Sequence, residues 1–227
     1  MKVKTCSRQV PVTNHDNRTL YTTIQKHGEP MGGCKLAVVA GRSGCGKTSS
    51  ILSGLYHANG FKCTELHVAS KSLHQPQFQF LGKVFEGLNI PYITYDSTED
   101  VCPISQAKVG AFFLFDDIVC DKQSRIRELY CFGRHKNIDS FYLSQTYSAV
   151  PKQLIRDNAN FIMLFRMDHT NLKHVYDEHV NVDMTYEKFK ELCAYCWKKP
   201  YGFMAIDKER DLNDGRYREG YHNFIII

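Results

Sequence analysis

The sequence predicts a three-layer α/β domain in which helices cover both faces of a mostly parallel central sheet. Apolar runs of strand length alternate along the chain with stretches of helical periodicity, as they do in βα units. The runs are apolar throughout, which is typical of parallel strands buried on both faces. One run, residues 35–40, leads into a glycine-rich stretch and then into a helix. The length of 227 residues suits one domain.

Composition narrows the class of protein. With 43% hydrophobic residues the chain can bury a substantial core, so we do not expect disorder. No apolar run approaches the ~18 residues of a membrane span, and residues 1–30 lack the apolar segment of a signal peptide. The nine cysteines are odd in number and dispersed, which favours reduced thiols in a cytosol-like compartment. The net charge of +5 fits a soluble basic protein as well as nucleic-acid binding.

Three segments are expected along the chain. Residues 1–33 are polar and form an N-terminal arm with one candidate strand at 18–24. Residues 34–167 form the core of the domain. Residues 168–227 add a helical segment and further strands, which complete the same domain.

The elements of the core follow from periodicity. Its strand candidates are residues 35–40, 64–69, 91–96, 111–117, 139–145 and 160–167. Its helix candidates are residues 47–57, 76–88, 122–135 and 151–158. The second helix has one apolar side, formed by Phe78, Leu81, Val84, Phe85 and Leu88. Pro151 opens the last helix.

The C-terminal segment has a different pattern. A helical stretch at 169–197 precedes strand candidates at 201–207 and 222–227, with a turn at 211–215 between them. The final apolar residues, 224–227, form either the last strand of the sheet or an apolar patch for a partner protein.

The stretch "GRSGCGKT", residues 41–48, fits the phosphate-loop pattern G-x-x-x-x-G-K-[ST]. Its glycines let the backbone fold tightly, so that N–H groups and the N-terminus of the following helix point at phosphate oxygens. Lys47 is expected to reach the β- and γ-phosphates, and the Thr48 hydroxyl to ligate Mg²⁺. Ser49 caps the helix or contacts the α-phosphate. The predicted nucleotide-binding residues are Gly41, Arg42, Ser43, Gly44, Cys45, Gly46, Lys47, Thr48 and Ser49.

Two acids follow a buried strand candidate in "FFLFDD". In P-loop enzymes a strand beside the P-loop strand ends in an acid that holds Mg²⁺, and Asp116 is placed for that role. A second carboxylate directly after it, Asp117, can polarise the attacking water. The pair favours ATP hydrolysis over nucleotide kinase chemistry, for which neither an arginine lid nor an acceptor site stands out. The alternative is a solvated pair of acids after a strand.

Two further side chains are candidates for sensing and completing hydrolysis. Gln145, at the end of a strand candidate, can touch both the γ-phosphate and the catalytic water, or it can simply cap the strand end. Arg134 follows a helix and can reach the γ-phosphate of a neighbouring subunit, where it would stabilise transition-state charge. The alternative for Arg134 is a solvated surface group.

Three segments together resemble the genome-packaging ATPases of poxviruses and other large eukaryotic DNA viruses, the viral branch of the FtsK–HerA superfamily. They are "GRSGCGKT", "FLFDDIVCDK" and "FGRHKNIDSFYLSQTYSAVPKQLIRDNANF". The last is the most specific, and the resemblance covers residues 34–167. The N-terminal arm and residues 168–227 resemble nothing that we can align.

The resemblance implies a RecA-like P-loop ATPase core that forms a homo-oligomeric ring and pumps double-stranded DNA into a preformed capsid. It implies ATP and Mg²⁺ as ligands, held by Lys47, Thr48 and Asp116. It assigns Asp117 as general base, Gln145 as sensor and Arg134 as the finger that acts in trans. It also implies a capsid portal or vertex protein as partner, no membrane, and a place in the host cytoplasm, a virus factory or the virion.

This sequence departs from the pattern of the superfamily at Asp117, and the finger has two alternatives. Many relatives carry Glu at the position of Asp117, and the shorter acid here can lie farther from the water. Arg42 and Arg156 are alternatives to Arg134 as the finger. No acidic constellation of a nuclease is present in the sequence, so we do not expect the chain to cut DNA.

Three other functions remain open on the sequence. A helicase-like or plasmid-type translocase on the same core would unwind duplexes or move DNA outside a capsid. A nucleotide switch would hydrolyse slowly and without stimulation by DNA. A nucleotide or nucleoside kinase would transfer the phosphoryl group to an acceptor other than water.

Weaker signals lie in the C-terminal segment. Cys193 and Cys196 have a zinc-like spacing without a second pair, and they are more often two packed thiols. His169, His174 and His179 are expected at the surface or facing DNA. A DNA channel or a solvated edge would use the basic and aromatic residues Lys198, Lys199, Tyr201, Lys208, Arg210, Arg216, Tyr217, Arg218 and Tyr221.

Overall fold

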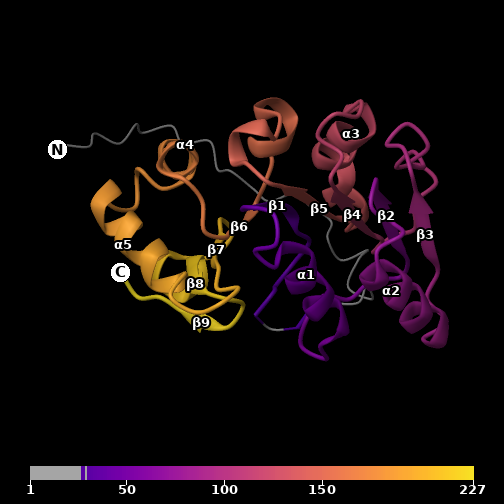
Figure 1. The fold of residues 1–227 in the computed structure, drawn as a ribbon, viewed down its shortest axis with the longest axis horizontal. Coiled ribbons are helices and arrows are strands. Elements are labelled where there is room, and N and C mark those ends of the chain that lie inside the picture. The colour runs from indigo at the N-terminus through magenta and orange to yellow at the C-terminus, as the bar shows by residue number, and fades with distance from the viewer. Residues whose placement is uncertain (1–26, 29) are drawn as a thin grey trace, which may run out of the picture.

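The computed structural model describes residues 27–28 and 30–227, so the strand candidate at 18–24 lies outside the described residues. Within them the chain forms one nine-stranded sheet with strand order β3-β2-β4-β5-β1-β6-β7-β8-β9 (Figure 1). The six strands from β3 to β6 run parallel, and β7, β8 and β9 are antiparallel. The predicted α/β class with a mostly parallel sheet is confirmed.

The bounds of the elements follow the predicted alternation. The strands are β1 (Leu36–Ala40), β2 (Leu66–Ser70), β3 (Tyr92–Tyr95), β4 (Phe112–Asp116), β5 (Asp139–Ser144), β6 (Phe161–Leu164), β7 (Met204–Asp207), β8 (Tyr217–Glu219) and β9 (Asn223–Phe224). The α-helices are α1 (Lys47–Tyr56), α2 (Pro76–Gly87), α3 (Ser124–Phe132), α4 (His169–His179) and α5 (Tyr186–Cys196). None of these helices in the described chain is long and apolar enough to cross a bilayer.

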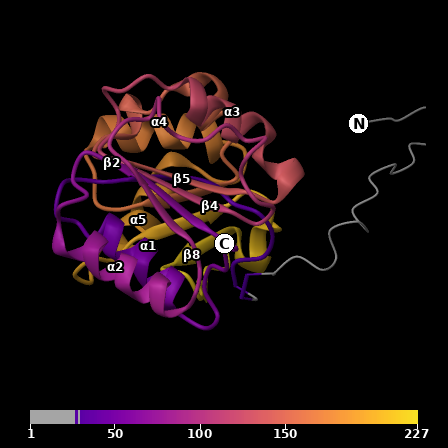
Figure 2. The same ribbon diagram turned by 90° about the vertical axis from the view of Figure 1, so that its right-hand side faces the viewer.

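Helices cover both faces of the sheet, which makes three layers (Figure 2). Helices α1 and α2 pack on one face, while α3 and α4 pack on the other. Helix α5 contributes Phe189 and Cys193 to the same core as α3 and α4. Successive residues of β1 serve the two cores in turn, because side chains of a strand alternate between its faces. Val38 joins the cluster under α3 and α4, and Val39 joins the cluster under α1 and α2.

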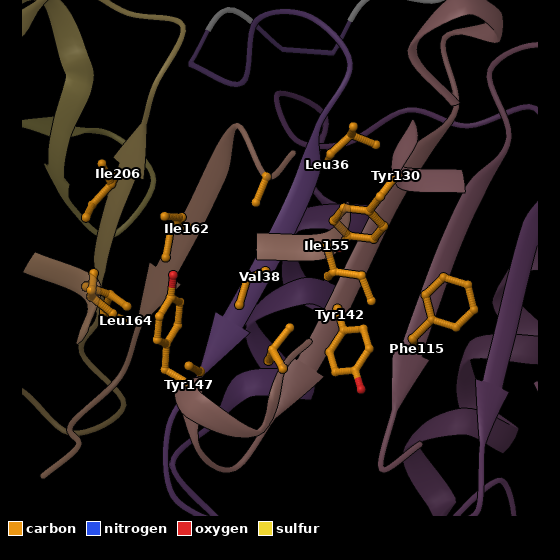
Figure 3. Close-up of a cluster of buried hydrophobic side chains, with 14 of the residues drawn as sticks. Leu36, Val38, Phe115, Tyr130, Tyr142, Tyr147, Ile155, Ile162, Leu164 and Ile206 are labelled. Atoms are coloured by element: carbon orange, nitrogen blue, oxygen red, sulfur yellow. The ribbon is translucent and has the colours of Figure 1, made fainter. Parts of the chain in front are cut away.

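Aromatic and branched side chains from several strands meet in the first of these cores (Figure 3). Val38 of β1 is in register with Tyr142 of β5 and with Ile162 of β6, so the three side chains lie across neighbouring strands. Tyr147, from the turn after β5, enters the same cluster and is fully buried. The end of β5 is therefore tied into the core.

Two predicted elements differ from the structure. Residues 151–158, predicted as a helix, form an irregular turn in which Gln153 and Leu154 have non-helical backbone angles, with φ of 69° at Leu154. The turn brings both Ile155 and Arg156 into the interior. The predicted strand at 222–227 shortens to β9, and β8 was not predicted.

Strand β8 escaped prediction because a charged residue, Arg218, is buried at its centre. Arg218 Nη2 donates to Asp207 Oδ2 at 2.7 Å, and Lys35 Nζ donates to both oxygens of the same carboxylate at 3.0 and 3.1 Å. All three residues are at most 1% exposed. The DNA-channel interpretation is therefore wrong for Arg218, and also for Tyr217, which is buried and donates to Asp183 at 2.6 Å.

We expect Asp207→Asn to destabilise the fold by about 3–5 kcal/mol, because two buried cations would lose their shared counter-charge. The free energy of unfolding in urea measures this effect. Asp177→Asn is the matched control, because Asp177 makes an exposed pair with Lys173 within α4 and its loss should cost less than about 1 kcal/mol. Equal effects of the two substitutions would contradict the stabilising role of Asp207.

Candidate nucleotide site

The P-loop connects the carboxyl end of β1 to helix α1 at the edge where the parallel strands end. Gly44 and Gly46 have φ of 71° and 98°, the left-handed region that favours glycine. Gly46 is the N-cap of α1, and no side chain caps the first turn of that helix. The first turn of α1 also contains no acid. Its N–H groups and its positive end are therefore available to an anion such as phosphate.

Lys47 lies across this loop. Its Nζ donates to the carbonyl oxygens of Gly41 at 2.7 Å and Arg42 at 3.0 Å, and the residue is only 8% exposed. The ammonium group is thus held at the P-loop backbone by carbonyls alone, with no carboxylate bonded to it in the described chain. Arg42 and Ser43 form the exposed tip of the loop, and Ser49 is exposed at the start of α1.

The first acid meets the P-loop helix directly. Thr48 Oγ1 donates to Asp116 Oδ2 at 2.9 Å. Burial raises the pKa of Asp116, the negative charge of Asp117 adds to the rise, and Thr48 and Lys47 oppose it. A buried carboxylate beside a hydroxyl is a set of hard oxygen donors of the kind that Mg²⁺ accepts, so these residues fit that cation.

The topology corrects one detail of the prediction. The strand that ends in Asp116 was expected beside the P-loop strand, but β5 lies between β1 and β4. The side chains of Thr48 and Asp116 reach across the end of β5 to make their contact. Gly41 N also donates to the carbonyl of Ser144, the last residue of β5, at 3.2 Å. The end of β5 is consequently in contact with the start of the P-loop.

Asp117 and Gln145 lie at this same edge. Asp117 has φ of 55°, a left-handed conformation that is unusual for a non-glycine residue and is concentrated at functional sites. It is exposed, and its carboxylate has no hydrogen bond within the described chain. Gln145 is also exposed and directly follows β5, the strand between the P-loop strand and the acidic strand. The structure therefore places Lys47, Thr48, Asp116, Asp117 and Gln145 at one edge of the sheet.

Arg134 lies elsewhere. It precedes β5 in the chain, and the amino ends of parallel strands are at the edge opposite the P-loop. Its guanidinium pairs with Glu209, just after β7. Arg134 is therefore far from the P-loop of its own chain. Of the two alternatives, Arg42 is exposed in the P-loop, whereas Arg156 is buried and pairs with Glu178 at 3.0 Å, so that it is not free to reach another subunit.

The loop after β5 is anchored by a polar network that the sequence did not predict. Tyr147 Oη donates to Glu178 Oε2 at 2.7 Å and lies 2.6 Å from His179 Nε2. Arg156 stacks over the Tyr147 ring at 4.9 Å. The prediction that His179 faces solvent or DNA is wrong, because its side chain is only 4% exposed. The loop that carries Gln145 is held to α4 through these contacts.

This environment predicts a pH dependence of stability. Burial lowers the pKa of His179 to about 3, and the positive charges of Lys208, Arg156, Arg216 and Lys152 add to the shift. Below pH ~6.5 His179 is protonated in the unfolded chain but stays neutral in the folded chain. The free energy of unfolding therefore decreases as pH falls. We expect this residue to account for a loss of about 2 kcal/mol between pH 7 and pH 5.

Chemical denaturation at the two pH values checks this expectation. In His179→Gln the decrease in unfolding free energy on acidification should shrink by the stated amount. His174→Gln is the control, because His174 is exposed on the same helix. The same pH slope in wild type and His179→Gln would contradict the buried, neutral state of His179.

The cysteine pair in α5 is buried. Cys193 Sγ donates to Met204 Sδ at 3.6 Å, and Cys196 is also inaccessible. Burial raises the pKa of both thiols. Throughout the described residues no group of three His, Cys, Asp or Glu side chains gathers around a point that could hold a metal ion. The eight cysteines that the structure describes are all free thiols.

One part of the site was missed entirely. A cavity of about 280 Å³ lies beside the P-loop and is lined by Gly44 and Cys45, by residues 165–166 after β6, and by residues from 197 to 202, between α5 and β7. No motif marks the lining residues outside the P-loop, and Lys199 and Tyr201 were candidates for a DNA channel. The position of these residues in the chain could have indicated their place. A strand that runs antiparallel to β6 begins at the edge where the parallel strands end, so the loop before it must lie at the same edge as the P-loop.

Comparisons with known proteins match this fold. No family model and no curated protein sequence matches the chain. Among solved structures, the genome packaging NTPase B204 of Sulfolobus turreted icosahedral virus 2 in complex with sulfate is similar, with a TM-score of 0.59 and 14% identity. The match covers 87% of this chain and 100% of that one.

Two further structures of B204 give the same result. The complex with ATP-gammaS has a TM-score of 0.55 at 14% identity, with 85% and 98% of the two chains covered. B204 of Sulfolobus turreted icosahedral virus, described as a DNA-packaging ATPase, has a TM-score of 0.56 at 15% identity, again with 85% and 98% covered. At such identities the likeness establishes a shared fold.

Proposed function

We propose that this chain hydrolyses ATP with Mg²⁺ and uses the energy to move double-stranded viral DNA into a preformed capsid, as a packaging ATPase of the poxvirus and large eukaryotic DNA virus type. The observation that carries the proposal is the Thr48–Asp116 contact beside an uncapped P-loop helix that holds Lys47. The fold shared with viral packaging NTPases and the resemblance of residues 132–161 support it. A homo-oligomeric ring that engages a portal or vertex protein is part of the proposal, as is action in the host cytoplasm, a virus factory or the virion.

Each residue has a defined role in this proposal. The P-loop N–H groups and Lys47 bind the phosphates, and Thr48 and Asp116 would hold Mg²⁺, whose charge offsets that of the phosphate oxygens. Asp117 accepts a proton from the attacking water, whose oxygen bonds to the γ-phosphorus as the bond to the β–γ bridging oxygen breaks. Gln145 orients that water. Because Arg134 lies at the opposite edge of its own sheet, it can act only on the site of a neighbouring subunit.

The test is ATP hydrolysis by the purified chain with and without linear double-stranded DNA, at low and moderate salt. We expect stimulation by DNA that weakens as salt rises, because contacts to the DNA backbone release counterions. The stimulated rate should be lost in Asp117→Asn and in Arg134→Ala. Arg127→Ala, an exposed arginine on α3, is the control for a change of surface charge.

Mixing the two inactive variants tests the ring. An Arg134→Ala subunit keeps Asp117, and an Asp117→Asn neighbour can supply Arg134, so mixed assemblies should recover part of the activity. Slow hydrolysis that ignores DNA and procapsid, with no recovery on mixing, would contradict a translocating ring and favour a nucleotide switch.

A further inference from the structure

The cavity beside the P-loop lies on the side away from the acids. Strand β5 separates β1 from Asp116 on one side, and β6 and then β7 flank β1 on the other. The cavity opens on this second side, between the P-loop residues Gly44 and Cys45 and the loop that leads into β7. A nucleotide whose γ-phosphate lies toward Asp116 and Asp117 would extend its other end toward this cavity.

Tyr201 is the most unusual residue of the cavity. It has φ of 59°, a left-handed conformation that costs an aromatic residue free energy, and it is nevertheless 70% exposed. Its ring lies on the P-loop, because a Cβ placed on Gly46 would come within 3.1 Å of Tyr201 Cδ1. A strained aromatic side chain that stays exposed beside a phosphate loop has the properties of a ligand contact.

The opposite wall is rigid. Trp197 Nε1 donates to the carbonyl of Leu164 at 2.8 Å, which fixes the indole and occupies its polar atom. Phe165 is buried behind the P-loop, where it packs against Phe203 with 5.1 Å between ring centroids. Pro200 completes the apolar part of the lining. The cavity therefore presents aromatic and apolar surface that does not depend on the ligand for its position.

The charged side chains of the lining are both cations. Arg166 is exposed and has no partner within residues 27–28 and 30–227, and Lys199 Nζ donates to Glu219 Oε1 at 2.8 Å. No carboxylate or amide side chain lines the cavity. Arginine and lysine side chains donate hydrogen bonds and cannot accept them, so neither cation can pair with the 6-amino group of adenine. The lining side-chain groups that can accept are the Tyr201 hydroxyl and the Cys45 thiol.

We propose that this cavity takes the base and sugar of the nucleoside triphosphate and holds the base by stacking on Tyr201 instead of reading its edge. This rests on the proposed function, because the P-loop must bind the phosphates of the same ligand. Stacking is tolerant of base identity, since every base has a π-face. Selection by hydrogen bonds to a base edge would give far larger ratios, of the order of 10⁴. On this basis the chain is a nucleoside triphosphatase that discriminates ATP from GTP by less than tenfold.

Direct binding to ATP, GTP and inorganic tripolyphosphate tests the proposal, because tripolyphosphate engages the P-loop but has no base. We expect Tyr201→Ala to weaken ATP and GTP by roughly 10- to 100-fold and to leave tripolyphosphate affinity within a factor of two. Tyr201→Phe should bind all three as the wild type does. Tyr195→Ala, an exposed tyrosine of α5 outside the cavity, is the matched control.

Two results would overturn the inference. Equal weakening of ATP and tripolyphosphate in Tyr201→Ala would mean that Tyr201 only shapes the P-loop. A preference of more than tenfold for either ATP or GTP would mean that the base edge is read. Lys47→Ala separates this inference from the proposed function. If Lys47→Ala keeps wild-type affinity for both ATP and tripolyphosphate, the P-loop assignment itself fails, whatever the result for Tyr201.

Discussion

Asp117→Asn is expected to lower kcat for ATP hydrolysis by roughly 10²- to 10⁴-fold while ATP affinity stays within a few-fold of the wild type. The loss is that of a general base, because an amide cannot take the proton of the attacking water. Affinity should persist because the carboxylate of Asp117 is exposed and makes no side-chain hydrogen bond to the P-loop. Steady-state hydrolysis and equilibrium binding of a non-hydrolysable ATP analogue measure the two quantities separately.

The matched control for this variant is Asp96→Asn. Asp96 is exposed and directly follows β3, at the same edge of the sheet, but β2 lies between β3 and β4. The same chemical change there should leave kcat unaltered. Asp117→Asn with wild-type kcat would exclude Asp117 as the base, and a loss of analogue binding in that variant would assign the residue to nucleotide binding instead.

Lys47→Ala should abolish measurable binding of ATP, with an expected loss of at least 100-fold in affinity. The buried ammonium group is the one cation of the loop that contacts its backbone, and it would exchange two carbonyl partners for phosphate oxygens. Equilibrium binding with a fluorescent ATP analogue measures the loss. Lys83→Ala is the control: it removes the same positive charge from an exposed position on α2, and this variant should bind ATP as the wild type does.

Thermal unfolding of the Lys47→Ala protein completes this test. The cooperative transition should remain, because Lys47 bonds only to neighbouring backbone carbonyls and to no distant element. Loss of binding in a folded protein then reports on the site. Unchanged ATP affinity in Lys47→Ala would refute the nucleotide site.

The parts of the site that the sequence predicted lie at the ends of predicted strands. The P-loop comes at the end of one buried strand, and Asp116 and Asp117 come at the end of another. Short apolar runs with turn signals predict such strands well. Gln145 was placed correctly at a strand end for the same reason. The position of β5 between β1 and β4 was not predictable, because strand order depends on pairing between residues far apart in the chain.

The parts that were missed depend on tertiary contacts of polar residues. Arg218 and Lys35 look like surface charges in a sequence, and only a shared carboxylate at Asp207 makes their burial possible. His179 was assigned to the surface because the five-residue spacing of His169, His174 and His179 spreads them around a helix. That spacing carries no information about the contact of His179 with Tyr147, which lies far upstream in the chain. Tyr201 belongs to no motif, and its place beside Gly46 arises only when β7 pairs with β6.

The central position of β1 has a consequence for how the chain folds. The P-loop strand β1 is synthesised early, but its two partner strands, β5 and β6, are synthesised much later. Leu36 pairs with Ser140 of β5, and Ala37 pairs with Phe161 of β6. Long-range parallel pairing of this kind is slow to form and leaves apolar strands exposed while synthesis continues. Competence to bind nucleotide should therefore appear late in refolding, in one step with the pairing of β5 and β6. A nascent chain that ends before residue 161 would contain the whole P-loop motif and still have no nucleotide site.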